Sequence, residues 1–394
     1  MTLSVDQIQR IAGFELNALR AAEVLGEEFD EVSIPRTGTS IYDLNGALLF
    51  YRLPLKRGRT PCGYADIAAD EALAEPLLGV AMSGAWDGKA LLEKGLSMAR
   101  KKRRGLKYDS VRFVAYSYPK LALQFSLAGK EVLMLELHTW TEVPPRPQER
   151  KSPEPSNFER WSLLDELPGE LRRTRVRGFK KRIARWESPD LRRLDPSVIR
   201  MGTLDPINIV IQLNDTQEIH YSQREHDHHP CYELRGQQTN VWCVAASVEM
   251  LMNFYRYHYD QPRLAKEMDL GTCSAPSGLP YGDEYKVVNT IEKLSSNTLD
   301  ATAITNPAWG TFETEIEANR PLISFIPGHS RTVAGYTRSM ILLLGKLPFR
   351  GLLVYDPWPP TDCAHPDAGG VITKWENFAT QTYRYAFTAV LKHV

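Results

Sequence analysis

The sequence lacks any run of roughly 20 apolar residues, the length that a membrane-spanning helix needs. Residues 1–13 include Asp6 and Arg10 and lack the continuous apolar stretch of a signal peptide. Neither charge is in excess, since 48 basic residues face 48 acidic ones. A balanced chain has no global field that favours nucleic acid or an acidic membrane surface. We therefore expect no nucleic-acid partner, no membrane insertion and a cytoplasmic location by default, with export by a dedicated system left open.

Cysteine is also scarce. The chain has five cysteines, an odd number, and none of them forms a Cys-x-x-Cys pair; they are Cys62, Cys231, Cys243, Cys273 and Cys363. This spacing indicates neither a disulfide framework nor a zinc ribbon. A reducing compartment is the expectation that follows. Cys231, Cys273 and Cys363 have no motif around them, so we expect them to be structural.

The length of 394 residues exceeds what one hydrophobic core usually supports, which favours more than one domain. Apolar periodicity predicts a helix over residues 5–25, followed by a small α+β module over residues 34–142. Within that module, Asn45-Gly46 between two apolar runs predicts a hairpin, and residues 86–104 predict a helix. Residues 111–127 and 131–137 predict two strands. The expected division is a helix in 1–33, the module in 34–142, a linker in 143–205 and a compact domain in 206–394.

The predicted linker is rich in proline at residues 144–155 and basic further on. Residues 170–193 hold ten basic residues in 24 positions. The plain interpretation is the solvated face of a helix. A proteolytic processing site and an electrostatic docking segment are the alternatives. Stacking aromatics are few there, which disfavours nucleic-acid binding.

Chemistry is concentrated around Cys243. The loop Gly236-Gln237-Gln238-Thr239-Asn240-Val241-Trp242 precedes it, and apolar residues at helical spacing follow it. Cys243 is therefore predicted to begin a helix. A helix N-terminus carries partial positive charge and unpaired N–H groups, and both favour the reactive thiolate.

Partners for this cysteine can be proposed along the chain. The amide of Gln237, six residues upstream, is a candidate oxyanion donor together with the Cys243 N–H, and Gln238 competes for that role. His329 lies between two apolar strands, next to Pro327-Gly328, and is the candidate base. Asp356 ends another apolar strand and is the candidate orienting group, with Asn377 as the second choice. We expect Trp358 to shield the pair from water.

The order Gln, Cys at a helix start, His on a strand and then Asp or Asn resembles papain-like cysteine peptidases. The segments GQQTNVWCVAAS, PGHSRTVAGY and VYDPWP look like the bacterial branch near staphopain-type and bacteriocin-leader-processing peptidases. The resemblance covers roughly residues 230–390. It implies Gln237 as oxyanion donor, Cys243 as nucleophile, His329 as base and acid, and Asp356 as orienter. One departure is that Trp242 precedes the cysteine, whereas a tryptophan follows it in many relatives of papain.

The N-terminal module resembles, more weakly, the prodomains of some bacterial peptidases. The segments that carry this likeness are SIYDLNGALLFYRLPL, GYADIAADEALAEPLLGV and VAYSYPKLALQF. Such modules are small, cystatin-like or PepSY-like α+β units that cover an active site. The resemblance implies an intramolecular inhibitor or folding aid, a zymogen, and cleavage in the basic linker.

These observations predict an α+β fold in which a papain-like peptidase domain, with its helix-start cysteine packed on an antiparallel sheet, follows a small α+β module. The expected reaction is hydrolysis of a protein or peptide substrate, without a cofactor or metal. The same residues also suit a transglutaminase-like or amidase-like acyl transfer, and a non-catalytic peptide-binding module is a further alternative. The tract Glu225-His226-Asp227-His228-His229 resembles a metal site, but adjacent ligands rarely fit one tetrahedral ion, so a surface loop is expected.

Overall fold

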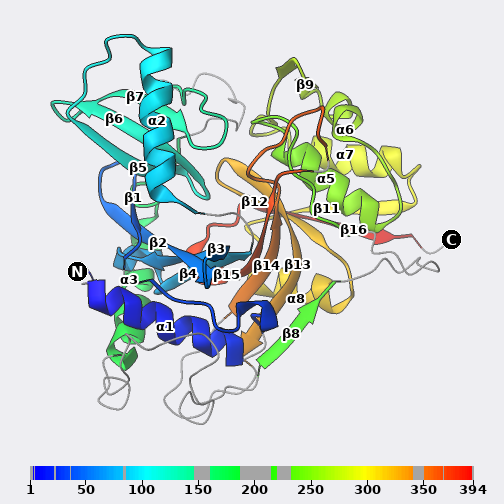
Figure 1. Ribbon diagram of the computed structural model, residues 1–394. Helices are drawn as coiled ribbons and strands as arrows, with labels where there is room; N and C mark the ends of the chain where they lie inside the picture. The colour runs from blue at the N-terminus through cyan, green and yellow to red at the C-terminus, as the bar shows by residue number, and fades with distance from the viewer. Residues whose placement is uncertain are drawn as a thin grey trace.

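The computed structural model describes residues 3, 5–21, 24–35, 37–82, 86–145, 160–186, 214–219, 232–339, 350–366 and 368–392 (Figure 1). Its α-helices are α1 (Val5–Ala21), α2 (Gly88–Lys102), α3 (Gly169–Trp186), α5 (Cys243–Phe254), α6 (Gln261–Glu267), α7 (Tyr285–Leu294) and α8 (Trp309–Glu317). Short 3₁₀ turns include η2 (Glu71–Leu73) and η5 (Phe378–Thr380).

The strands of the N-terminal half are β1 (Thr39–Tyr42), β2 (Leu48–Arg57), β3 (Thr60–Ala68), β4 (Leu77–Met82), β5 (Ser110–Ser117), β6 (Lys120–Leu127) and β7 (Lys130–Glu136). Those that follow are β8 (Asn214–Glu218), β9 (Gly271–Thr272), β10 (Ala275–Pro276), β11 (Leu299–Thr305), β12 (Leu322–Ile326), β13 (His329–Ser339), β14 (Arg350–Asp356), β15 (Val371–Asn377) and β16 (Tyr385–Leu391).

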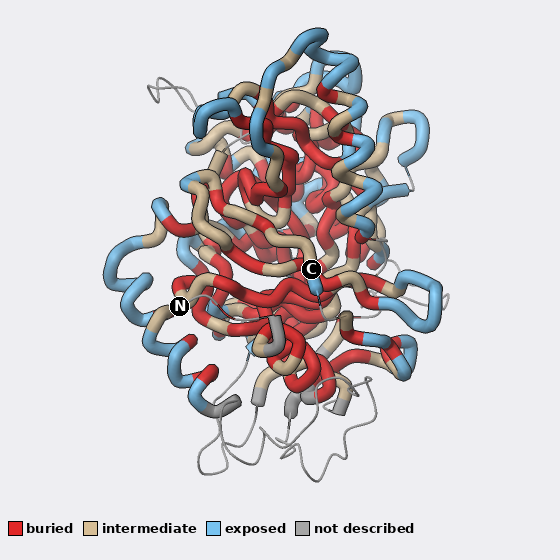
Figure 2. The backbone as a smooth tube through the Cα atoms, turned by 60° about the vertical axis from the view of Figure 1, so that its left-hand side comes forward, coloured by how far each residue is buried: buried red, intermediate tan, exposed pale blue. Residues whose placement is uncertain are grey.

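Within the described residues, one 14-stranded sheet runs through both halves of the chain in the order β11-β16-β12-β13-β14-β15-β4-β3-β2-β1-β5-β6-β7, with β8 added beside β13. The halves meet where β4 pairs with β15 in antiparallel register, from Gly79 opposite Glu376 to Met82 opposite Ile372. Buried residues gather along these strands, and exposed residues lie on outer helices and loops (Figure 2). The N-terminal half is therefore joined to the rest of the molecule by main-chain hydrogen bonds.

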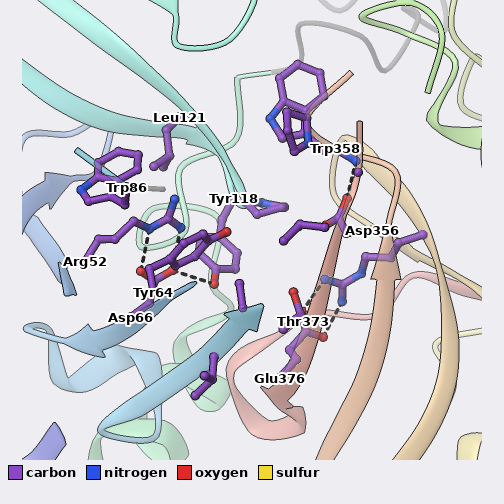
Figure 3. Close-up of a pocket in the computed structure, with 18 of the residues that line it drawn as sticks. Arg52, Tyr64, Asp66, Trp86, Tyr118, Leu121, Asp356, Trp358, Thr373 and Glu376 are labelled. Carbon is purple, nitrogen blue, oxygen red and sulfur yellow. Dashed lines mark hydrogen bonds and ion pairs between the residues drawn. The ribbon is translucent and has the colours of Figure 1, made fainter. Parts of the chain in front are cut away.

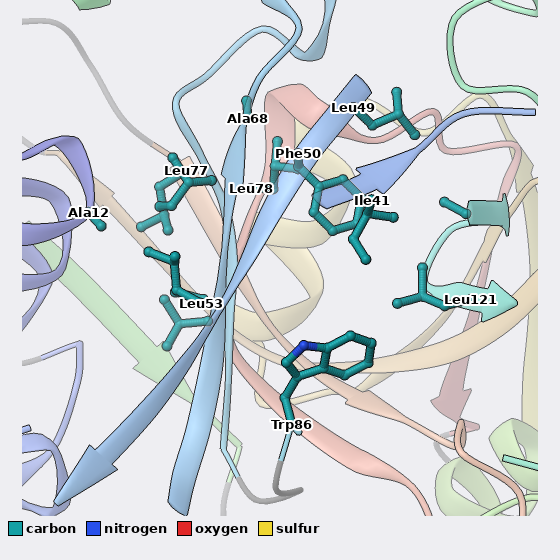
Figure 4. Close-up of a cluster of buried hydrophobic side chains, with 14 of the residues drawn as sticks. Ala12, Ile41, Leu49, Phe50, Leu53, Ala68, Leu77, Leu78, Trp86 and Leu121 are labelled. Atoms are coloured by element: carbon teal, nitrogen blue, oxygen red, sulfur yellow. The ribbon is translucent and has the colours of Figure 1, made fainter. Parts of the chain in front are cut away.

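The N-terminal half has its own hydrophobic core, to which the first helix contributes. Ile8, Ile11, Ala12, Leu16 and Leu19 of α1 are buried, which confirms the predicted apolar face of this helix. Figure 4 shows Ala12 on one side of the strands and Phe50, Ile41 and Trp86 on the other. Both faces of this part of the sheet are thus covered.

The predicted hairpin at Asn45-Gly46 is confirmed, because β1 and β2 pair on either side of it. The predicted helix over 86–104 is confirmed as α2. The prediction of a single strand over residues 111–127 is wrong. This range forms two antiparallel strands, β5 and β6, which are joined by a turn at Tyr118-Pro119. Proline cannot donate to a central ladder, so it ends β5 there.

In the C-terminal half, helices pack on the strands of the sheet, with α7 on β11 and α8 on β13. Helix α5 contacts β12 and β13, and its residues are buried almost without exception. Its core includes Trp242, Val244, Val248 and Leu251, as the apolar spacing predicted. The α+β fold class, with the cysteine at a helix start packed on an antiparallel sheet, is confirmed.

The region predicted as a linker contains ordered structure. Helix α3 packs on η2, and Phe179 and Ile183 join the N-terminal core. Arg175 of the same helix donates a 2.8 Å hydrogen bond to the carbonyl of Gln381, in the other half of the chain. The proline-rich segment from 146 to 159, the tract from Glu225 to His229 and Cys231 lie outside the described residues. No described helix is long and apolar enough to cross a membrane.

The cysteine spacing indicated no disulfide framework, and this prediction is wrong for one pair. Cys273 and Cys363, 90 residues apart, are joined, with their Cα atoms 6.3 Å from each other. The bond ties the β9–β10 hairpin to the segment that follows Asp356. Pairs this far apart leave no local spacing signal, because only the tertiary fold brings them together. Cys62 and Cys243 are free thiols.

Candidate active site

Cys243 is the first residue of α5, as predicted. The preceding Trp242 caps the helix without a side-chain hydrogen bond, and its indole N–H donates to the carbonyl of Leu270 at 2.9 Å. The buried indole therefore fixes the point at which the helix begins. The N–H groups of the first helical turn have no partner within the helix, and they point toward its N-terminal end, where Cys243 lies. The position supplies both partial positive charge and hydrogen-bond donors to a sulfur anion.

His329 is the first residue of β13, directly after the Pro327-Gly328 turn that links it to β12. Asp356 is the last residue of β14, which pairs with β13. Their side chains meet: His329 Nε2 lies 2.6 Å from Asp356 Oδ1, and the two side chains are 0% and 3% exposed. Two strand ends thus hold an imidazole and a carboxylate in contact, away from water.

The same carboxylate oxygen receives a second hydrogen bond. Asp356 Oδ1 also accepts the backbone N–H of Trp358 at 2.8 Å. Trp358 is buried, and its ring meets that of His138 edge to face with centroids 5.9 Å apart. The carboxylate therefore has a fixed rotamer, which a group that orients an imidazole requires.

A small cavity of about 20 Å³ brings the thiol and the imidazole together. It is lined by Cys243, Val244, Leu279, Pro280, Tyr281, Glu284, Phe325, Ile326, Gly328, His329 and Ser330. His329 Nδ1 is buried and has no hydrogen-bond partner within the described residues, so it is the ring atom available to the thiol. The cavity is too small for a peptide, and Cys243 is only 2% exposed. The site is closed in this structure.

The electrostatics of the pair favour a thiolate and an imidazolium. Burial raises the pKa of the Cys243 thiol, but the His329 ring, the Lys120 ammonium and the Ser330 N–H together bring the pKa below its ordinary value. Burial lowers the pKa of His329, yet the Asp356 carboxylate and the Cys243 sulfur outweigh it and leave that pKa raised. Each group thus stabilises the charged form of the other.

Gln237 is fully buried in the loop before α5. Its Nε2 donates one hydrogen to the carbonyl of Thr239 at 2.7 Å, and its backbone is held by Pro357 O and Thr361 N. An amide nitrogen carries two hydrogens, so a second donor remains on this group. Gln238 is also buried, and its backbone N–H donates to Gln261 Oε1 at 2.8 Å. The structure fixes both loop residues by their backbones.

Asn377, the second choice for the orienting role, lies elsewhere. Its side-chain oxygen accepts the N–H of Ala379 at 3.1 Å and caps η5. His329 Nε2 is already occupied by Asp356. Asn377 is therefore a helix cap in this structure, and the first choice is the residue that contacts the imidazole.

Residues of the N-terminal half also reach the site, and no sequence pattern predicted them. Lys120 Nζ donates to the carbonyl of Gly328 at 2.7 Å, and Ser117 Oγ donates to that of Pro327 at 2.9 Å. Asn240 Nδ2, in the loop before α5, lies 3.4 Å from Thr141 Oγ1. In the sequence, Lys120 is a single lysine at the start of an apolar strand, and nothing near it indicates that its side chain contacts Gly328.

A larger cavity of about 120 Å³ lies behind Asp356, between the two halves of the chain (Figure 3). Its N-terminal wall includes the buried Arg52–Asp66 ion pair, in which Nη2 and Oδ2 are 2.7 Å apart. The guanidinium of Arg52 lies over the rings of Tyr64 and Trp86. The opposite wall includes Asp356, Trp358 and the Arg331–Glu376 ion pair.

A metal centre has no support in the described part of the chain, where no group of three or more histidine, cysteine, aspartate or glutamate side chains has the arrangement of a metal site. The acidic and histidine-rich tract at 225–229 lies outside that part. The described site brings together the Cys243 thiol, the His329 imidazole and the Asp356 carboxylate, and Glu284 lies on the wall of the small cavity. Such a set suits nucleophilic acyl transfer.

A family model described as Peptidase_C39 like family matches residues 219–383, the range that contains Gln237, Cys243, His329 and Asp356. No curated protein matches the sequence. Among solved structures, the chain is similar to the peptidase domain of Streptococcus ComA, a bifunctional ABC transporter involved in a quorum-sensing pathway. The identity is 13% and the TM-score 0.26, over 41% of this chain and 99% of that one.

It is also similar to UfSP from C. elegans, at 11% identity and a TM-score of 0.27, over 49% of this chain and 36% of that one. The chain thus spans about a third of the UfSP structure. The family match, together with the cysteine at the start of α5, supports a cysteine peptidase in residues 219–383.

Proposed function

We propose that the protein hydrolyses peptide bonds through Cys243, His329 and Asp356. The observation that carries this proposal is the contact of 2.6 Å between His329 Nε2 and Asp356 Oδ1, with the helix-start thiol facing the same small cavity as the ring. Each side chain has the chemical character that its role needs: a nucleophile, a base and an orienting acceptor.

The reaction proceeds in two halves. The Cys243 thiolate attacks the carbonyl carbon, and the Gln237 amide and the Cys243 N–H stabilise the oxyanion. His329 gives its proton to the amine, which leaves as the carbon–nitrogen bond breaks. A water molecule then attacks the thioester while His329 accepts its proton, and the acid product and the thiolate are released.

The same proposal places the protein near staphopain-type and bacteriocin-leader-processing peptidases. It also divides the chain into a prodomain-like module, a basic linker and a peptidase domain. Synthesis as a zymogen is a further part of it. A thiol that is only 2% exposed supports a latent form. Arg384 links one wall of the cavity to the linker, since its guanidinium lies 4.4 Å from the Tyr281 ring and 5.8 Å from that of Trp161.

The decisive experiment is labelling with an epoxide thiol inhibitor, followed by mapping of the modified residue. We expect Cys243 to react, and Cys243→Ala to abolish turnover of a peptide library while the fold is kept. Cys62→Ser, which changes the other described free thiol, is the matched control. Turnover retained by Cys243→Ala would exclude the proposed nucleophile.

Product mass separates hydrolysis from transfer, the second reaction open to these residues. A gain of water marks hydrolysis, whereas a loss of ammonia marks transglutaminase-like transfer. Zymogen processing is tested by incubating the purified chain and sequencing new N-termini, with Cys243→Ala as the control for self-cleavage. An intact chain with full activity would remove the zymogen from the proposal.

A further inference from the structure

Lys120 is placed where a lysine is rarely found. Its side chain belongs to the first residue of β6 in the N-terminal half, and it is 1% exposed. Lysine is almost never fully buried without specific compensation. Its Nζ donates at 2.7 Å to the carbonyl of Gly328, a residue 208 positions later in the chain and the one directly before His329. The hydrogen bond that offsets the cost of burying this side chain is therefore made to a residue of the candidate active site.

The turn that carries His329 is held at two successive carbonyls. Ser117 Oγ donates to Pro327 O at 2.9 Å, and Lys120 Nζ donates to Gly328 O. Gly328 has a φ of 69°, a conformation that favours glycine, so the turn has a defined shape. Because His329 follows within the same turn, the β5–β6 turn of the N-terminal half fixes the place from which the imidazole projects.

The ammonium group also acts at a distance. It lies 5.4 Å from the centroid of the Trp358 ring. The backbone N–H of the same tryptophan donates a hydrogen bond to Asp356. The positive charge of Lys120 lowers the pKa of Cys243 and opposes the protonation of His329. Inside a protein such a charge is weakly screened.

Other charged groups around the thiol come from several elements. Asp356 from β14 raises the pKa of His329, and Glu284 lines the same cavity as the thiol. On the side of the lysine, Glu136 from β7 is buried; burial raises the pKa of Glu136, and Lys120 lowers it. Burial brings the pKa of His138 to about 4, so this imidazole is neutral at pH 7. The Lys120 ammonium thus acts electrostatically on both the thiol and the imidazole.

The half of the chain that carries Lys120 is not attached by a linker alone. Strands β4 and β15 pair within one sheet, and Trp375 of β15 belongs to the N-terminal hydrophobic core. A cut in the basic linker would leave these hydrogen bonds and this packing intact.

We propose, on the basis of the proposed function, that Lys120 is a positioning residue of the active site. It holds the turn that carries His329, and its positive charge acts on Cys243. The N-terminal half is then a working part of the enzyme that stays bound after any cut in the linker.

The test is the pH dependence of Cys243 alkylation by iodoacetamide in the full-length protein, for the wild type, Lys120→Met and Lys120→Arg. We expect the Met variant to shift the midpoint of alkylation to higher pH and to react about tenfold more slowly below that midpoint, as a shift of one pKa unit gives. The Arg variant keeps the charge and should restore most of the rate. Lys130→Met, an exposed lysine on neighbouring β7, is the matched control and should change nothing.

Lys120→Gln provides a second neutral variant, which keeps a donor for Gly328 O, in case the Met variant does not fold; thermal unfolding reports the fold of each. An unchanged midpoint in a folded neutral variant would overturn the role of Lys120 and leave the proposed function in place. If wild-type Cys243 reacts no faster than Cys62 both in the intact chain and after cleavage in the linker, the proposed function itself fails. The two failures are therefore distinguishable.

Discussion

Asp356 Oδ1 receives two hydrogen bonds at once, from His329 Nε2 at 2.6 Å and from the backbone N–H of Trp358 at 2.8 Å. The first bond fixes the ring so that Nδ1 is left for the thiol, and the second fixes the carboxylate. Orientation of the imidazole therefore depends on the chain direction just after β14, where the disulfide at Cys363 also ties the segment down.

Asp356→Asn should keep the shape of this contact and lose the charge that stabilises the imidazolium. By analogy with other triads, in which loss of the orienting carboxylate gives the wrong tautomer, we expect kcat to fall by about 10²–10⁴-fold. Steady-state cleavage of a peptide substrate measures it. Asp362→Asn, which removes an exposed carboxylate six positions later, should leave kcat within about twofold of the wild type. Equal activity of the two variants would exclude an orienting role for Asp356.

The pH profile of kcat/KM should be bell-shaped. Burial raises the pKa of Cys243, yet the neighbouring groups lower it overall, so the acid limb moves to lower pH. Asp356 and the sulfur raise the pKa of His329 against the effect of burial, so the alkaline limb moves to higher pH. Both shifts widen the range in which thiolate and imidazolium coexist. In Asp356→Asn the alkaline limb should move to lower pH, and a limb that stays in place would contradict this account.

Much of the site could be predicted because its signals are local. Apolar residues at helical spacing after Cys243 mark α5, and apolar runs on either side of Pro327-Gly328 mark the strands that present His329. Asp356 ends a strand whose residues are almost all apolar. These patterns report burial within a few residues of each functional group, which is what periodicity measures.

Contacts between distant segments could not be predicted. Lys120 reaches Gly328 across 208 positions, and Cys273 reaches Cys363 across 90. Neither pair shows a spacing pattern. The pairing of β4 with β15 joins the two halves and so allows Lys120 to reach Gly328, whereas Cys273 and Cys363 are brought together by the fold of the C-terminal half itself. The turn at Tyr118-Pro119 was different, since proline within an apolar run is itself a sign against one long strand.

Gln237→Ala should lower kcat by about 10²–10³-fold, because one donor to the oxyanion is lost. The wild-type amide is buried and gives one hydrogen to Thr239 O, which orients the group. Gln238→Ala is the matched control: it removes the neighbouring side-chain amide, which is also buried, and leaves the backbone N–H of residue 238 to bond Gln261. Kinetics of both variants, with unfolding curves to exclude a loss of fold, decide between the two glutamines. A larger loss of kcat in Gln238→Ala would transfer the oxyanion role to that residue.

Reduction of the Cys273–Cys363 disulfide should destabilise the C-terminal half. The bond joins positions 90 residues apart, and disulfides typically contribute about 2–4 kcal/mol, mainly by restricting the unfolded chain. Urea unfolding with and without a reductant measures the change, and Cys363→Ser should behave like the reduced wild type. Cys62→Ser leaves the bond intact and should respond to the reductant as the wild type does. Because the bond anchors the segment after Asp356, the reduced protein should also lose activity at urea concentrations that the oxidised protein tolerates. Identical unfolding midpoints in both redox states would show that the two sulfurs are not joined in solution.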